Sequence, residues 1–145
     1  MHLIHFKLKK HSIIYQLLLI GSPLFIGLMI YAMSRSGSIL CNKWLNVLGI
    51  TFQQHYLPNL IKYSLPDGLF ALSSMLTLYI IWKWKAPLLW EILVIFLLIL
   101  SELLQGNYIA GTYDPIDLLS IGFAIIISQL ICIYVNYKNH TYTHD

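Results

Sequence analysis

Acidic and amide side chains stand at the ends of long apolar segments, and they are the residues of this sequence best suited to chemistry. Glu102 and Gln105 lie three positions apart at the end of one segment, so they should share a helix face. Asp114 and Asp117 flank the start of the next segment. A carboxylate bordering hydrocarbon costs free energy, about 2.5–3.5 kcal/mol at the bilayer centre and less near its surface. These four residues are therefore candidate ligand-binding residues.

Basic side chains from an earlier loop could join this group. Arg35, His55 and Lys62 lie between the first and second apolar segments, and they complete the set of candidate binding residues. A site with charges of both signs would suit a polar headgroup or a cation.

A purely structural role explains some of these acids better than others. Residues 64–67 (SLPD) and 114–117 (DPID) share a capping residue, a proline and an aspartate, which is typical of helix starts. Asp67 and Asp114 are therefore predicted to cap helices. Glu102 is predicted to end a helix, where the dipole disfavours an anion. It should need a cation, a donor such as Gln105, or a ligand.

The remaining motifs give no sign of a metal site, a cofactor or an enzyme. His140 and His144 have the i,i+4 spacing of two metal ligands, but they lie in a polar tail that has no need to be helical. The sequence contains no catalytic triad spacing, zinc pattern or phosphate-binding glycine loop. The sequence thus predicts no metal and no cofactor, and it favours a protein that is not an enzyme.

Composition places these residues in a membrane protein. Of 145 residues, 58% are hydrophobic and only 10% are charged, and the mean hydropathy is +0.70, which is too apolar for a soluble domain. The net charge of +3 comes mainly from bases in tails and between apolar segments. The expected partner of these bases is the lipid bilayer surface, not nucleic acid.

The apolar segments predict an all-α bundle of about four transmembrane helices in a single domain over residues 1–145. The spans are residues 13–33, 65–82, 87–105 and 115–135, each with about the 20 residues that a crossing needs. Residues 38–64 are less apolar and are predicted to lie along the membrane interface. The first span, with an expected bend at residues 21–23, is longer than the apolar part of a signal peptide, although a cleaved signal is the alternative.

The distribution of bases predicts the orientation. Six of the nine Lys and Arg residues lie in the two tails and the second loop, so both termini should be cytoplasmic. Cys41 and Cys132 would then lie on opposite sides and could not form a disulfide. A stripe of small residues at Ser120, Ala124 and Ser128 should allow close helix packing inside the bundle.

Residues 102–117 resemble the VanZ-like family of small bacterial membrane proteins. Glu102, Gln105, Asp114 and Asp117 match the family's acidic and amide positions around a short loop, whereas its arginine near Thr112 and its asparagine at Ile121 are missing. The resemblance implies a multi-pass protein of the bacterial cytoplasmic (inner) membrane, a family whose founding member is associated with reduced sensitivity to a glycopeptide antibiotic. It implies no mechanism.

Three functions remain open from sequence. The favoured hypothesis is a non-enzymatic protein that binds a cell-envelope headgroup or another membrane protein. The second is a membrane-embedded hydrolase or transferase acting on a lipid-linked substrate, with Glu102 or Asp117 as general base and His55 as a second acid-base group. The third is a subunit of a transporter or channel.

Overall fold

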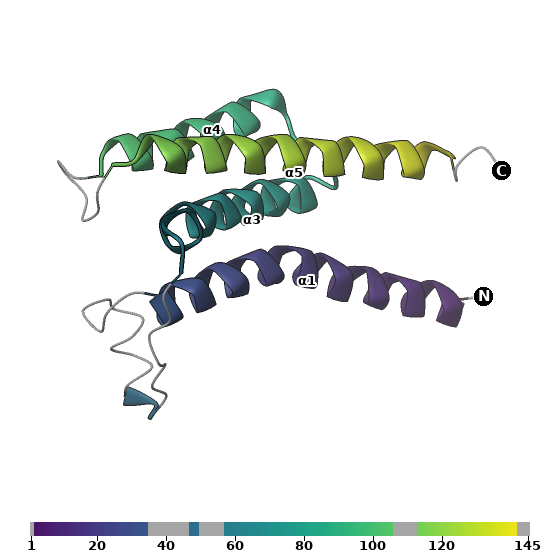
Figure 1. Ribbon diagram of the computed structural model, residues 1–145. Coiled ribbons are helices and arrows are strands. Elements are labelled where there is room, and N and C mark those ends of the chain that lie inside the picture. The colour runs from purple at the N-terminus through teal and green to yellow at the C-terminus, as the bar shows by residue number, and fades with distance from the viewer. Residues whose placement is uncertain (1, 35–46, 50–56, 106–112, 142–145) are drawn as a thin grey trace.

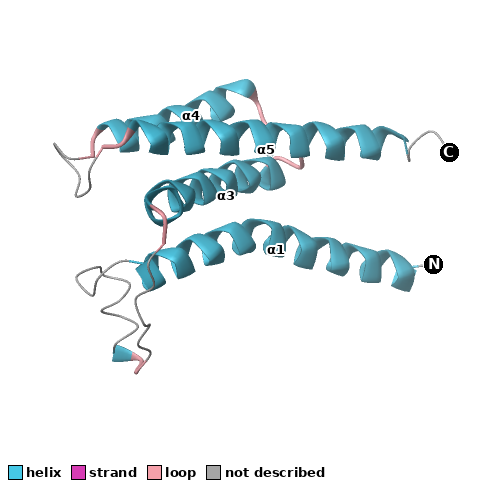
Figure 2. Ribbon diagram, viewed as in Figure 1, coloured by secondary structure: helices cyan, strands magenta, loops and turns pink. Residues whose placement is uncertain are grey.

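Four long helices and one π-helical segment make up the computed structural model, which describes residues 2–34, 47–49, 57–105 and 113–141. No β-strand forms within these ranges, which confirms the predicted all-α fold (Figure 2). The elements are α1 (His2–Ser34), η1 (Leu60–Ser64), α3 (Leu65–Ile81), α4 (Leu88–Leu103) and α5 (Pro115–Thr141).

The helices run back and forth along one another (Figure 1). α3 lies between α1 and α5, and α4 lies beside α5. Both chain termini lie at one end of the bundle, while the starts of α3 and α5 and the end of α4 lie at the opposite end, called here the distal end. This arrangement brings together the ends of three helices that are far apart in the sequence.

Within the described parts of the chain, three helices are long and apolar enough to cross a membrane: Ile13–Ser34, Leu60–Ile81 and Pro115–Tyr137. Large apolar side chains such as Leu17, Phe25 and Phe123 are exposed on them, as expected where a helix faces lipid. α4, the third predicted span, has 16 residues and extends about 24 Å. It is thus shorter than the roughly 30 Å of hydrocarbon.

The second predicted span begins earlier than expected. Its helix starts at Leu60, because η1 continues without a break into α3, so the last part of the segment predicted to lie at the interface belongs to this helix. Pro66 has no N–H to donate and would clash with a carbonyl one α-turn back. The wider π turn relieves this, and the Leu65 N–H donates to the Leu60 carbonyl.

The centre of the bundle is built from small and medium side chains of α3, α4 and α5. Ala71, Leu98, Ile121 and Ala124 form one buried apolar cluster. Ala124 and Ser128 of the small-residue stripe are buried, which confirms that the stripe packs inside the bundle.

α1 is attached to α3 by a hydrogen bond from Ser73 Oγ to the Ile20 carbonyl, at 2.9 Å. The interior of α1 contains Pro23, and the helix is bowed (Figure 1).

The turn between α3 and α4 is fastened to α5. Lys83 and Trp84 adopt positive φ angles of 50° and 67°, which reverse the chain after α3. The Trp84 N–H donates to the Tyr79 carbonyl at 2.6 Å. Asn136 Nδ2 of α5 donates to the Trp84 carbonyl at 2.7 Å. This end of the bundle is therefore held by polar contacts as well as by apolar packing.

Candidate functional site

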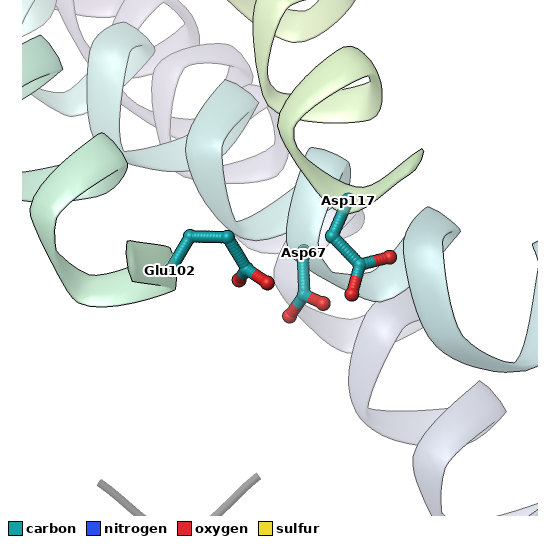
Figure 3. A group of neighbouring side chains, drawn as sticks. All are labelled: Asp67, Glu102 and Asp117. Carbon is teal, nitrogen blue, oxygen red and sulfur yellow. The ribbon is translucent and has the colours of Figure 1, made fainter. Parts of the chain in front are cut away.

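Three carboxylates converge at the distal end of the bundle. Asp67 comes from the first turn of α3, Glu102 from the last turn of α4, and Asp117 from the first turn of α5. One oxygen from each residue lies within 4.8 Å of the oxygens of the other two. Figure 3 shows the three side chains next to one another, with the Glu102 carboxylate directed toward Asp67. We call this group the carboxylate cluster.

A close approach of α3 and α5 positions two of the three acids. A Cβ atom at Gly68 would lie only 3.1 Å from the carbonyl oxygen and from Oγ of Ser120, so only glycine fits without displacing α5. Ser120 Oγ also donates to the Ser64 carbonyl at 2.6 Å. Asp67 and Asp117 are one and three residues away from these contacts, which explains why their carboxylates meet.

Glu102 is the most deeply buried member of the cluster. Only 1% of Glu102 and 4% of Asp117 is exposed, whereas Asp67 is half-buried. Gln105 Nε2 donates to Glu102 Oε2 at 2.8 Å. Glu102 Oε1 and Asp117 Oδ1 are buried and have no hydrogen-bond partner among the described residues. A buried charge without a partner is costly, so these two oxygens call for a positively charged group or a proton.

The remaining long helix, α1, also contacts the cluster. Tyr31 of α1 donates its hydroxyl hydrogen to Asp67 Oδ1, with an oxygen-to-oxygen distance of 3.3 Å. Gly27 lies one turn earlier in α1, and a Cβ there would meet Pro66 at an ordinary contact distance of 3.6 Å. Side chains from all four long helices therefore contribute to the same end of the bundle.

The predicted pairing of Glu102 with Gln105 is confirmed by their hydrogen bond. Asp117 lies in the cluster. Asp114 lies outside it and caps α5, because its Oδ1 accepts the Ile116 N–H at 2.9 Å.

The predicted basic partners have different outcomes. Lys62 Nζ lies 5.0 Å from the centre of the Tyr63 ring, a cation–π contact. Among the described residues, no Lys forms a salt bridge with Glu102 or Asp117. Arg35 and His55 lie outside the described residues, as does Cys41, whereas Cys132 is a free thiol.

Asp67 is the member of the cluster that sequence reasoning did not include. Ser64, at the start of α3, makes no side-chain capping hydrogen bond, and the Asp67 carboxylate lies in the cluster. The useful signal was the shared pattern of residues 64–67 and 114–117. That pattern places an aspartate at the same depth on two helices that both point away from the distal end.

The cluster suits the binding of a cation better than proton transfer to a substrate. Carboxylate oxygens are the ligands that hard cations prefer. The nearby hydroxyl of Ser120 donates to the Ser64 and Asp117 carbonyls, so it is not activated by any of the three acids.

An apolar groove is lined by Gly68 and Ser120, which lie one residue after Asp67 and three after Asp117, but by none of the three acids. It lies between the η1–α3 helix and α5 and has a volume of about 380 Å³. Ser64, Gly68 and Ser120 line its polar end, and Phe123 and Ile127 line its apolar part. A groove of this composition, on helices whose outer faces are apolar, fits a hydrocarbon chain.

No protein-family model, curated protein or solved structure matches this chain.

Proposed function

We propose that this chain is a non-enzymatic, multi-pass membrane protein that binds a cell-envelope component through a positive charge held at the carboxylate cluster. The component is a membrane lipid or lipid-linked molecule, or else a partner protein in the same membrane. The VanZ-like pattern of Glu102, Gln105, Asp114 and Asp117 supports this proposal, as does the apolar composition.

One observation carries the proposal, namely the state of Glu102. Only 1% of the residue is exposed, and it lies at the negative end of its helix. One of its buried oxygens has no hydrogen-bond partner among the described residues. Gln105 satisfies only the other oxygen. A buried acid at such a position, with no Lys paired to it among the described residues, is best explained by binding.

The groove supports a lipid-borne ligand. It shares Ser120 with the hydrogen bonds that join α3 to α5 at the cluster. A molecule with a polar head at the cluster and a hydrocarbon chain in the groove would use both features at once. A charged, water-soluble ligand would leave the groove unexplained.

The location we propose is the bacterial cytoplasmic membrane, with both termini in the cytoplasm. The two termini share one end of the bundle (Figure 1), and six of nine basic residues lie in the tails and second loop. Under the positive-inside rule, the carboxylate cluster then faces the outer side, where envelope components are assembled and exposed.

Native mass spectrometry of the protein extracted in nanodiscs from its own membrane tests the proposal. We expect wild-type protein and Glu91→Gln to retain the same lipid or protein adduct, and Glu102→Gln to lose it. Glu91 is a matched control because it lies in the first turn of the same helix, away from the cluster. Equal retention by Glu102→Gln would contradict the proposed function.

A further inference from the structure

We propose that the positive charge at the carboxylate cluster is a single divalent metal ion of the oxygen-preferring kind, with Ca²⁺ the best fit. The ligands are one oxygen each from Asp67, Glu102 and Asp117. This inference rests on the proposed function, since it names the cation through which the cluster would act. It departs from the expectation from sequence that the chain has no metal site.

The spacing of the three oxygens fits one ion. Ca²⁺ binds oxygen at about 2.3–2.6 Å, so two ligands on opposite sides of it are at most roughly 5 Å apart. One oxygen of each carboxylate lies within 4.8 Å of the other two, so small side-chain adjustments bring all three into contact with one ion. Mg²⁺ binds at about 2.0–2.1 Å and demands an octahedral site, so opposed ligands must approach to about 4 Å. Ca²⁺ is the better match, because its longer and more flexible coordination tolerates the wider ligand spacing.

The buried oxygens without partners show where the ion would lie. Glu102 Oε1 and Asp117 Oδ1 are both buried, and neither accepts a hydrogen bond from a described residue. Their carboxylates lie on either side of the Asp67 carboxylate in Figure 3, with one oxygen of each of the three acids within 4.8 Å of the others. Like charges this close repel strongly in a medium of low dielectric constant. A divalent ion offsets the repulsion of all three acids, whereas one shared proton would neutralise only one of them.

Neighbouring donors hold two of the ligands in place. Gln105 Nε2 binds Glu102 Oε2, which fixes the carboxylate and leaves Oε1 for the ion. Tyr31 donates to Asp67 Oδ1. Residues that orient metal ligands in this way are a regular part of protein metal sites.

Three carboxylates do not complete the coordination of Ca²⁺, which takes six to eight oxygens. The remaining positions would be taken by water or by oxygens of a ligand. Phosphate oxygens of a lipid headgroup are well suited to these positions, because they can bind the metal ion directly. The open positions of the ion could in this way hold a phosphate-bearing headgroup whose acyl chain occupies the groove between α3 and α5.

Isothermal titration of Ca²⁺ into the full chain in phosphatidylcholine nanodiscs tests the inference. We expect one saturable site per chain in the wild type and in Glu91→Gln, and binding weaker by about tenfold or more in Glu102→Gln and in Asp117→Asn, because affinity follows the number of charged ligands. Excess Mg²⁺ should compete only weakly. Absence of a saturable site in the wild type would overturn the inference. Binding as tight as that of the wild type in both Glu102→Gln and Asp117→Asn would overturn it as well.

Thermal unfolding provides a measurement that does not depend on any variant. Adding Ca²⁺ to chelator-treated wild-type protein should raise the unfolding temperature, since a ligand that binds only the folded state stabilises it. No shift in the unfolding temperature at saturating Ca²⁺ counts against the site.

The two proposals can fail separately. Lipid retention without Ca²⁺ binding would leave the proposed function standing, with an ammonium group as the cation. Ca²⁺ binding without a retained adduct would leave the metal site standing and remove the envelope component.

Discussion

Ser120 of α5 donates a hydrogen bond of 2.6 Å to the backbone carbonyl of Ser64, at the junction of η1 and α3. This contact joins two helices that are separated by 56 positions in the sequence. It lies within one turn of both Asp67 and Asp117, so the distance between their carboxylates depends on it. Small residues make the approach possible, because Gly68 faces Ser120 directly.

Replacing Gly68 with alanine should therefore destabilise the bundle. The new Cβ would lie 3.1 Å from the Ser120 carbonyl oxygen, and backbone atoms of α5 would have to move. We expect a loss of about 1–3 kcal/mol, as for other overpacked cores, seen as a lower unfolding temperature in detergent.

Gly122→Ala is the matched control for that prediction. Nothing lies within 4 Å of a Cβ at Gly122, and alanine is the better helix former by about 1 kcal/mol. Gly122→Ala should therefore leave stability unchanged or raise it. Equal effects of the two substitutions would show that α3 and α5 do not pack through Gly68.

The opposite end of the bundle should depend on Asn136. Its amide donates to the carbonyl of Trp84, in a turn whose two residues have positive φ. Asn136→Ala should cost about 1 kcal/mol, the usual net value of such a hydrogen bond. Ile133→Ala, on an exposed position of the same helix, provides the baseline. An unfolding temperature equal to that baseline would show that the turn is held by packing alone.

Accessible cysteines can test the orientation. In a background with Cys41 and Cys132 replaced by serine, we expect Tyr113→Cys to react with a membrane-impermeant thiol reagent in intact cells, and Lys85→Cys to react only after lysis. Both positions are exposed, and they lie at opposite ends of α4 and its flanking turns. Labelling of Lys85→Cys alone in intact cells would reverse the proposed orientation.

Sequence predicted the helices well because a membrane leaves few other ways to satisfy the backbone. The apolar segments gave each helix, and the three-residue spacing gave the pairing of Glu102 with Gln105. The exact start of the second span was missed. Residues 64–67 look like a helix start because Pro66 suits a first turn, but the π-helical winding of η1 continues the helix through it.

Membership of the carboxylate cluster was only partly predictable, for a related reason. Asp114 and Asp67 each lie beside a proline near a predicted helix start, so both were assigned to capping. In the structure, Asp114 does cap α5, whereas Asp67 faces Glu102 and Asp117. The difference arises from how α3, α4 and α5 meet, which local patterns do not specify. Lys62 was likewise expected near the acids, but its contact is with Tyr63.

The contrast between Glu102 and Asp114 separates a binding site from a set of helix caps. Asp114→Asn keeps a side-chain oxygen for the Ile116 N–H, so most of the capping should remain and the stability should change by less than about 1 kcal/mol. Glu102→Gln removes a charge from a buried group that has an oxygen without a partner among the described residues. In chelator, where nothing but the protein compensates the three acids, we expect Glu102→Gln to unfold at a higher temperature than the wild type.

With Ca²⁺ present, the difference in unfolding temperature between Glu102→Gln and the wild type should become smaller or change sign. The ion would stabilise the wild type through all three carboxylates, whereas Glu102→Gln would gain less from it. Asp114→Asn should follow the wild type under both conditions, because its side chain is outside the cluster. Differential scanning fluorimetry of the three proteins, with chelator and with Ca²⁺, measures all of these temperatures. If Glu102→Gln and Asp114→Asn behave alike in both conditions, then Glu102 has no role beyond packing at the end of α4.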